Sequence, residues 1–326
     1  MKHIALIGAG QLGSRHLQAL ALLEQPATFY VVDPAQESLD ITRSRFFEVK
    51  GAERHQETIR FCQTFQELPR QLDLVVVATG SRIRRHVIEA LLAHAEVPYL
   101  LLEKILFSKP EDYAAVGELL TQKGVTAWVN CPRRMIAYYQ ELKERLKNEP
   151  RLSLTVTGSN WGLACNGIHF VDLFAYLTGD EAVTLSGAQL DGHILESKRA
   201  GYLELTGTLL GSTANGSTLA VTSLPDGTAG LGLSITAGGQ RYHLDEGKRL
   251  TYFATAAQQW QWEQETWGWL FQSQLTNVAA QQILTSGTCD LTPYAASAGQ
   301  HLALLAAFMP VIQLSSPQPL SECLIT

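Results

Sequence analysis

Short apolar runs alternate with amphipathic stretches along roughly the first 130 residues of the chain. Five runs are almost entirely apolar, as in strands buried on both faces: residues 4–7, 29–32, 72–78, 97–102 and 126–129. Helices are predicted between them, over residues 11–23, 87–92 and 113–122. Repeated strand–helix–strand units predict an α/β domain with a doubly wound parallel sheet, whose ligands bind at the carboxyl ends of the strands.

Beyond residue 130 the pattern changes to alternation with a period of two, which is typical of strands with one solvated face. The alternating segments are residues 152–157, 202–209, 217–224, 231–237 and 240–244. A helix is predicted over residues 134–149. We therefore predict two domains: residues 1–130 form the doubly wound domain, and residues 131–326 form an α+β domain with an open, mainly antiparallel sheet.

A glycine-rich turn follows the first apolar run. It reads Gly8-Ala9-Gly10-Gln11-Leu12-Gly13. In a Rossmann dinucleotide-binding domain Gly8 permits the tight turn, Gly10 lets the backbone approach a pyrophosphate, and Gly13 lets helix and strand pack closely. The alternative interpretation is a glycine turn that binds no ligand.

The residues around this turn favour NAD(H) as the cofactor. A pyrophosphate would bind the N–H groups at the start of the helix, near Gln11 and Leu12. Asp33 ends the second apolar run, twenty residues after Gly13. Its carboxylate can accept hydrogen bonds from ribose hydroxyls and would repel a 2′-phosphate, so NAD(H) is preferred to NADP(H).

Charge and composition narrow the class of protein. The net charge of the 326-residue chain is -6, without a run of Lys or Arg, which argues against nucleic-acid binding. No signal peptide and no apolar run of about 18 residues is apparent, so a cytoplasmic protein without a membrane span is expected. Five scattered cysteines contain no Cys-x-x-Cys pair, and no metal is expected. Only 17% of residues are charged, below the usual fraction of about a quarter. A surface with so few charges favours a homo-oligomer, in which another subunit covers part of that surface.

Two predicted strands end on residues that suit an active site. The strand over residues 97–102 is followed by Glu103 and Lys104, and the strand over residues 72–78 is followed by Thr79. Lys104 is either a surface charge at a strand end or a proton-transfer group at the binding edge of the sheet. Thr79 would lie in a loop beneath the cofactor.

A second set of candidates lies in the other half of the chain. His169 and Asp172 are three residues apart and so share one face of a helix. The carboxylate can orient the imidazole for acid–base chemistry, or it can simply satisfy a histidine at a helix start. Arg133 and Arg134 can clamp an anionic group of a substrate, or they can form a solvated helix start.

Taken together, these motifs resemble those of the glucose–fructose oxidoreductase/inositol dehydrogenase (Gfo/Idh/MocA) family over nearly the whole chain. The glycine turn continues as Ser14-Arg15-His16, Glu103-Lys104 stands in the place of the family's Glu-Lys-Pro, and Asn130 precedes Arg133-Arg134. Gly167-Ile168-His169 with Asp172 matches the family's signature helix.

The resemblance implies a dehydrogenase that acts on a CHOH group of a sugar, cyclitol or nucleotide sugar. Lys104 would then contact the reacting oxygen, His169 would be its acid–base partner, and Asp172 would orient His169 or bind a substrate hydroxyl. Glu103 and Thr79 would join the cofactor-binding residues. The expected substrate-binding residues are Arg133, Arg134, Trp161, Cys165 and Asn166. The open sheet commonly forms the subunit interface in this family, which implies a dimer or tetramer.

Two positions depart from the family pattern. Cys165 stands where the family usually has Asp, so the carboxylate of that position is missing. Ile105 stands where Pro often follows Glu-Lys, which removes a rigid and often cis turn. We predict an NAD(H)-dependent oxidoreductase of a small polyhydroxylated substrate. The alternatives are an enzyme that uses bound NAD for transient oxidation in epimerisation or elimination, and a non-catalytic protein that senses NAD or sugar.

Overall fold

The structure, a computed structural model, describes residues 1–326 and divides into two compact units. The first unit comprises Met1–Phe107, Glu111–Pro132 and Leu270–Ala295. The second unit comprises Ser108–Pro110, Arg133–Trp269 and Ala296–Thr326. The prediction that residues 131–326 form one domain is therefore wrong for Leu270–Ala295, which returns to the first unit. A change of periodicity along the chain cannot reveal such a return, because it depends on contacts distant in sequence.

The first unit contains a seven-stranded sheet in the order β17-β6-β5-β4-β1-β2-β3, in which every pair but β17·β6 is parallel. The strands are β1 (Lys2–Ile7), β2 (Ala27–Val32), β3 (Ile59–Cys62), β4 (Leu74–Val77), β5 (Tyr99–Leu102), β6 (Thr126–Val129) and β17 (Thr292–Pro293). The predicted doubly wound sheet is confirmed. All four residues of β4 are fully buried because the central strands carry helices on both faces.

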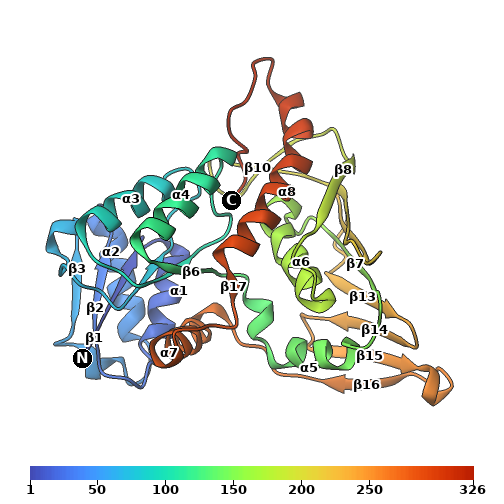
Figure 1. Ribbon diagram of the computed structural model, residues 1–326, viewed down its shortest axis with the longest axis horizontal. Helices are drawn as coiled ribbons and strands as arrows, with labels where there is room; N and C mark the ends of the chain where they lie inside the picture. The colour runs from blue at the N-terminus through green and yellow to red at the C-terminus, as the bar shows by residue number, and fades with distance from the viewer. The chain divides into compact units, whose positions relative to one another are not determined.

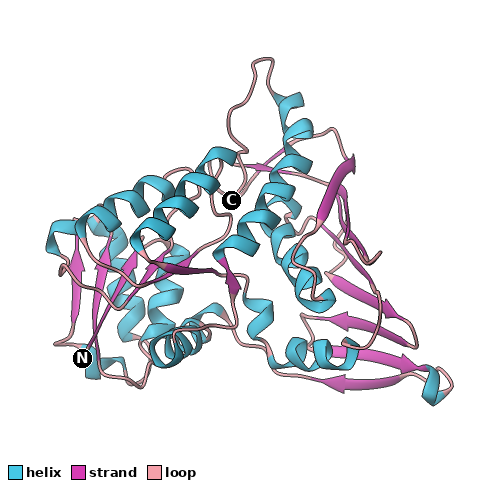
Figure 2. Cartoon of the chain, viewed as in Figure 1, coloured by secondary structure: helices cyan, strands magenta, loops and turns pink.

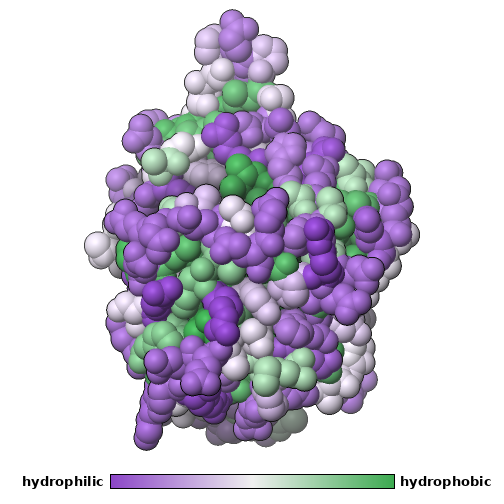
Figure 3. Space-filling model, turned by 90° about the vertical axis from the view of Figure 1, so that its left-hand side faces the viewer, coloured by the Kyte–Doolittle hydropathy of each residue, from purple (hydrophilic) through white to green (hydrophobic).

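Helices cover both faces of this sheet (Figure 1). On one face lie α1 (Gln11–Leu20), α2 (Gln36–Phe47) and α7 (Thr276–Ser286), and on the other lie α3 (Arg84–His94) and α4 (Pro110–Lys123). The short 3-10 helices are η1 (Ala52–His55), η2 (Phe65–Glu67) and η5 (Gln272–Gln274). The face seen in Figure 3, at the β3 end of the sheet, is mainly hydrophilic, and its apolar groups are small and separate.

The second unit contains an eight-stranded sheet in the order β16-β15-β14-β13-β7-β12-β11-β8. The strands are β7 (Ser153–Ser159), β8 (Thr184–Leu190), β11 (Gly207–Ser212), β12 (Thr218–Leu224), β13 (Gly232–Ala237), β14 (Gln240–Asp245), β15 (Leu250–Thr255) and β16 (Glu263–Thr266). All pairs except β7·β12 are antiparallel, which confirms the predicted mainly antiparallel sheet. A separate pair is formed by β9 (Leu195–Glu196) and β10 (Leu203–Glu204).

Helices cover only one face of this second sheet, as Figure 2 shows. They are α5 (Ala137–Leu146), α6 (Leu163–Thr178) and α8 (Tyr294–Ile312). The short 3-10 helices here are η3 (Pro132–Met135), η6 (Gln313–Ser315) and η4 (Ala256–Gln258), which lies between β15 and β16. In β7, Leu154 and Val156 are buried whereas Thr155 and Thr157 are exposed. The predicted period of two thus corresponds to one face in the core and one face rich in Ser and Thr.

Three local expectations differ from the structure. The strand predicted over residues 202–209 is broken into β10 and β11, since Gly207 has a φ of 94°. The helix predicted over residues 134–149 begins as η3 and continues as α5. The helical segment Tyr294–Ser315 is long and apolar enough to cross a membrane, with a mean hydropathy of 1.4 over its most apolar 18 residues, although the sequence suggested no such segment. A core helix meets the same criterion, and 56% of its apolar window is buried within the protein.

Candidate active site

The glycine turn lies between the end of β1 and the start of α1. Gly8 has a φ of 97°, a region that favours glycine. A Cβ atom on Gly13 would lie 1.9 Å from the Gly8 carbonyl oxygen, so only glycine allows the turn to pass this close to the helix. A Cβ atom on Gly10 would have no atom within 4 Å, so the turn is open at this position. Gly10 is also the N-cap of α1 and provides no capping side chain.

The start of α1 is therefore open to an anion. The first N–H groups of a helix have no partner within it, and here they belong to Gln11, Leu12 and Gly13. The Gln11 side chain accepts a hydrogen bond of 2.8 Å from Arg45 Nη1. These features fit a pyrophosphate on the backbone of the turn.

Asp33 and Thr79 flank the same turn. Asp33 Oδ2 accepts a hydrogen bond of 2.8 Å from the Ala9 N–H, and Oδ1 accepts one of 2.9 Å from the Ala35 N–H. Each carboxylate oxygen has a second lone pair, which leaves capacity for ribose hydroxyls. Thr79 Cγ2 would lie 3.1 Å from a Cβ on Gly8, and the buried Thr79 Oγ1 has no hydrogen-bond partner within the protein. An orphaned hydroxyl beside an open glycine turn fits a dinucleotide.

Glu103 follows β5 and is the centre of a buried polar network. Its Oε1 accepts hydrogen bonds from His16 Nε2, at 2.8 Å, and from the Asn130 amide. His16 Nδ1 lies 2.8 Å from Thr276 Oγ1, and Asn130 donates to Gln272 Oε1. Although burial raises the pKa of Glu103, the hydrogen bonds and charge of His16, with the charge of Lys104, hold that pKa below its ordinary value. An ionised carboxylate is thus fixed beside Lys104.

Lys104 is the one side chain of residues 100–107 that is not buried. It therefore leaves the core at the carboxyl end of β5, where ligands of a doubly wound sheet bind. The Lys104–Ile105 peptide bond is cis, so the expectation that Ile105 removes a cis turn is wrong.

Arg84 is a residue that the sequence analysis missed. Its side chain is 2% exposed, and it donates to the carbonyl oxygens of Thr79, Ile105 and Leu106. One guanidinium thus joins the loop after β4 to the loop that follows Lys104. In the sequence Arg84 stands beside Arg82 and Arg85, so it looks like part of a solvated helix start.

In the second unit, α6 carries the other candidates. Cys165, Asn166 and His169 are partly exposed, and Cys165 lies one turn before His169. Trp161 Nε1 donates a 2.8 Å hydrogen bond to the Thr222 carbonyl oxygen, and Asn166 Nδ2 donates to the Trp161 carbonyl oxygen at 3.1 Å. These contacts place the four side chains around the first two turns of α6.

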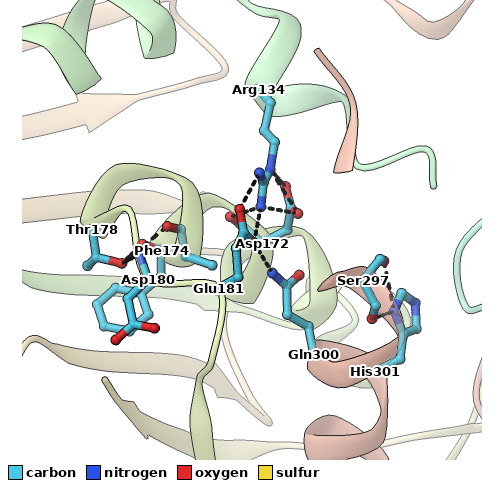
Figure 4. A network of polar contacts seen from close by, with 10 residues as sticks. Arg134, Asp172, Phe174, Thr178, Asp180, Glu181, Ser297, Gln300 and His301 are labelled. Atoms are coloured by element: carbon cyan, nitrogen blue, oxygen red, sulfur yellow. Dashed lines mark hydrogen bonds and ion pairs between the residues drawn. The ribbon is translucent and has the colours of Figure 1, made fainter. Parts of the chain in front are cut away.

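Asp172 lies in a buried ion-pair network with Arg134. The Asp172 side chain is fully buried, and both of its carboxylate oxygens accept hydrogen bonds of 3.0 Å from Arg134 Nε. The other two nitrogens of Arg134 donate to Glu181 at 2.9 Å, and Gln300 also donates to Glu181. Figure 4 shows the guanidinium of Arg134 between the two carboxylates. The three-residue spacing of His169 and Asp172 in the sequence did not indicate that Asp172 pairs with Arg134.

Arg133 is also bound to a carboxylate of its own unit. Its Nε and Nη2 donate to Glu246 at 2.8 and 2.6 Å, and its guanidinium lies 4.2 Å from the centre of the Phe170 ring. Tyr139 donates to the same carboxylate. The contacts of Arg133 and Arg134 favour structural roles over the substrate clamp that their sequence position suggested.

These features define a class of protein. A doubly wound sheet carries an open glycine turn, an acidic residue at the end of β2 and a lysine at the end of β5, which together are typical of an NAD-binding oxidoreductase. Residues 2–131 match the model of the Gfo/Idh/MocA oxidoreductase family, described as an NAD-binding Rossmann fold. Residues 2–131 therefore form an NAD-binding Rossmann domain of the type that this family model describes, in agreement with the family resemblance and the NAD cofactor expected from the sequence. None of the curated proteins matches the chain.

Solved structures share the fold over nearly the full length. An oxidoreductase from Agrobacterium radiobacter, crystallised with NAD+, L-tartaric acid and magnesium, is 17% identical with a TM-score of 0.73, covering 95% of this chain and 96% of that chain. The UDP-N-acetylglucosamine 3-dehydrogenase GnnA from Acidithiobacillus ferrooxidans is 16% identical with a TM-score of 0.69, covering 94% and 96%. A super-repressor mutant of Gal80p from Saccharomyces cerevisiae is 12% identical with a TM-score of 0.72, covering 97% and 99%. At these identities the likeness establishes the fold.

Proposed function

We propose that this protein is an NAD(H)-dependent oxidoreductase that transfers hydride to or from the carbinol carbon of a sugar, cyclitol or nucleotide sugar. The observation that carries the proposal is the placement of Lys104. Its side chain is the partly exposed one in an otherwise buried segment at the binding edge of the Rossmann sheet. The buried His16–Glu103 pair precedes it, and Arg84 binds the carbonyl oxygens that follow it.

When bound, NAD supplies the hydride acceptor or donor. Lys104 Nζ donates a hydrogen bond to the reacting oxygen and polarises it; in reduction the ammonium passes a proton to that oxygen, and in oxidation the amine receives it. Glu103 keeps a negative charge beside the lysine. His169, on the partly exposed side of α6, serves as the second proton-transfer group.

The remaining candidate residues divide into two groups. We assign Trp161, Cys165 and Asn166 to substrate contact, because they are partly exposed around the start of α6. Asp172 and Arg134 are positioning residues that act on α6 from within the core. Cys165 adds no carboxylate, so proton transfer rests on Lys104 and His169.

The test is a titration with NADH and NADPH, followed by a panel of sugars, cyclitols and nucleotide sugars read at the nicotinamide absorbance. We expect tighter binding of NADH and turnover of at least one panel member. Failure to bind either dinucleotide would overturn the proposal. Cofactor that co-purifies and does not exchange, with an altered sugar as product, would instead favour transient oxidation in epimerisation or elimination.

A regulatory function is the second candidate. Cys165 replaces the Asp that the family usually has, and a similar fold occurs in the super-repressor mutant of Gal80p. NADH binding together with sugar binding, but without turnover of any bound sugar, would favour this function over catalysis.

We also propose that copies of the chain associate through the uncovered face of the second sheet. Near the β15–β16 end Tyr252, Trp260 and Trp262 are 45%, 42% and 51% exposed, which is a large aromatic surface for a face rich in Ser and Thr. Light scattering on the purified protein should report a dimer or tetramer, and Trp262→Glu should shift it towards the monomer. A monomer at all concentrations contradicts this proposal.

A further inference from the structure

Helix α2 binds the glycine turn between β1 and α1 through two of its side chains. Thr42 Oγ1 donates a hydrogen bond of 2.7 Å to the Ala9 carbonyl oxygen, and both groups are buried. Arg45, one turn further along α2, donates from Nη1 to Gln11 Oε1 and to Ser14 Oγ, both at 2.8 Å. Contacts that span 31 to 34 positions of the chain thus hold the turn in place.

Arg45 is itself fixed at both ends. Its carbonyl oxygen accepts a 3.0 Å hydrogen bond from Gln18 Nε2, and Gln18 Oε1 accepts one of 2.8 Å from Arg15 Nη1. Ser14 is 1% exposed, and its hydroxyl donates a hydrogen bond of 2.9 Å to the Gln11 carbonyl oxygen. The guanidinium of Arg45 therefore fixes Gln11 at two points, directly at the side-chain oxygen and through Ser14 at the backbone.

The contact with Arg45 determines which end of the Gln11 amide is presented to a ligand. An amide oxygen only accepts hydrogen bonds, whereas an amide nitrogen and a guanidinium only donate them. Because the Gln11 oxygen faces the guanidinium, the exposed Nε2 end keeps its two N–H groups for a ligand. The opposite orientation would place two donors against each other at 2.8 Å. Arg45 therefore selects the donating orientation of Gln11.

This donor lies at a helix end that attracts anions. Gln11 is the first residue of α1, and the N-cap Gly10 provides no side chain. No acidic side chain lies in the first turn of α1 to compete with an anion. Both acceptors of Arg45 are uncharged, so they leave its positive charge in place beside the helix end. Free N–H groups, an amide donor and a cation together favour a pyrophosphate.

We propose that Arg45 is a positioning residue for the cofactor, which holds the Gln11 amide so that Nε2 donates to the pyrophosphate of NAD(H). Arg45 contacts Gln11 and Ser14 and acts on the cofactor through them. The inference rests on the proposed function, because it concerns the same dinucleotide. It adds to the cofactor site a side chain of α2 that lies outside the glycine motif.

The alternative is that Arg45 only links two neighbouring helices. Loss of a structural link would disturb the whole dinucleotide site, including the part that binds adenosine. Loss of the Gln11 donor would instead weaken only those ligands that carry the pyrophosphate. Adenosine and NADH therefore separate the two roles, and neither measurement needs turnover.

The experiment measures the Kd of NADH by fluorescence titration and the Kd of adenosine by competition with NADH. Arg45→Met and Gln11→Met should each raise the Kd of NADH about tenfold, which corresponds to the loss of one hydrogen bond to a charged group. The Kd of adenosine should not change. Arg43→Met is the matched control on α2, because the Arg43 guanidinium lies 4.5 Å from the centre of the Phe61 ring and should leave both Kd values unchanged.

The double variant Arg45→Met, Gln11→Met tests whether Arg45 acts through Gln11. If it does, the double variant should bind NADH about as weakly as Gln11→Met alone, whereas two independent effects would multiply to about 100-fold. Thermal unfolding shows whether each variant is folded. Gln11 is exposed, so Gln11→Met still tests the proposal if Arg45→Met does not fold.

The outcomes separate this inference from the proposed function. An unchanged Kd of NADH in Gln11→Met or in folded Arg45→Met overturns the inference and leaves the oxidoreductase. Equal weakening of adenosine and NADH in Arg45→Met, or multiplied effects in the double variant, also overturns it. NADH binding that depends on both residues, without turnover of any sugar, supports the inference and contradicts catalysis. Failure of the unsubstituted protein to bind NADH overturns both.

Discussion

Arg84 Nη1 lies 2.7 Å from the carbonyl oxygen of Leu106 and donates a hydrogen bond to it from the start of α3. The same guanidinium binds the carbonyl oxygens of Ile105 and Thr79. A single buried cation thus holds both loops that leave the carboxyl ends of β4 and β5. Because Lys104 lies directly before Ile105, its backbone is fixed from both sides, by the Glu103 network and by Arg84.

Replacing Arg84 by Met should disturb Lys104 more than it disturbs cofactor binding. The substitution keeps an apolar stem but leaves buried carbonyl oxygens without donors, each at a cost of about 1–3 kcal/mol. We expect the free energy of unfolding to fall by roughly 3 kcal/mol and kcat to fall further than NADH affinity. Arg82→Met is the control, because Arg82 is exposed on the same segment. Equal effects of the two substitutions on kcat would contradict the proposal that Arg84 holds the backbone of Lys104 in place.

Lys104→Met should remove the proton-transfer group and preserve the fold. A positioned acid–base group contributes about 10²–10⁴ to the rate, so kcat should fall by at least about 100-fold. NADH binding, measured by fluorescence titration, should change little. Lys123→Met, at the exposed end of α4, should leave kcat unchanged. Retention of turnover in Lys104→Met would contradict the proposed mechanism.

Asp33→Ser should weaken the preference for NADH over NADPH. The substitution removes the negative charge that repels a 2′-phosphate and the oxygens that hold the Ala9 and Ala35 N–H groups. We expect the Kd for NADH to rise at least about tenfold, in line with the loss of charge-assisted hydrogen bonds, while the Kd for NADPH falls or stays constant. Asp40→Ser, an exposed change on α2, serves as the comparison. An unchanged ratio of the two Kd values would refute the role of Asp33.

Glu103→Gln should make the free energy of unfolding less dependent on pH in the acid range. The folded-state pKa of Glu103 is lowered, so its ionised form stabilises the folded protein above the ordinary value of 4.5 and this stabilisation is lost as the pH falls. At pH 7 the variant should be less stable by about 3 kcal/mol, the cost of breaking a buried pair. Urea unfolding should show the difference shrinking as the pH falls below about 4.5. A constant difference across this range would contradict the expected linkage.

Asp172→Asn should chiefly destabilise the second unit. The substitution leaves buried Arg134 with one fewer carboxylate, and removing one partner of a buried ion pair costs about 3–5 kcal/mol. The double variant Arg134→Met, Asp172→Leu should recover part of that loss because no buried charge remains unpaired there. Thermal unfolding of the three proteins provides the measurement. If Asp172→Asn leaves stability unchanged but reduces turnover, Asp172 acts on His169 directly, as the sequence suggested, and not through the structure of the second unit.

Features encoded locally were predictable from the sequence. The glycine turn, the apolar strands β1, β4 and β5, and the position of Lys104 all follow from residues that are neighbours in the chain. The period of two in β7 and β12 likewise shows which side chains face the core. For these elements the prediction and the structure agree, because the burial of a strand and the form of a tight turn depend on residues that are close together in the chain.

Features that depend on distant contacts could not be predicted in this way. Arg134 meets Asp172 across 38 positions of the chain, and Asp172 was expected at His169 instead. Arg84 stands among other arginines, so only its burial reveals its role. Short polar strands such as β16 are also missed, because Glu263–Thr266 contains no apolar residue to mark a buried face.

The return of Leu270–Ala295 to the first unit has a consequence for biosynthesis. The segment supplies Gln272 and Thr276, which complete the hydrogen bonds of Asn130 and His16 around Glu103. A ribosome must therefore translate the chain as far as Thr276, well beyond the rest of the cofactor domain, before that domain can acquire these buried contacts. Residues Arg133–Trp269 leave the ribosome exit tunnel before this segment does. The Rossmann domain of the nascent chain therefore stays incomplete until a segment that is synthesised much later has emerged.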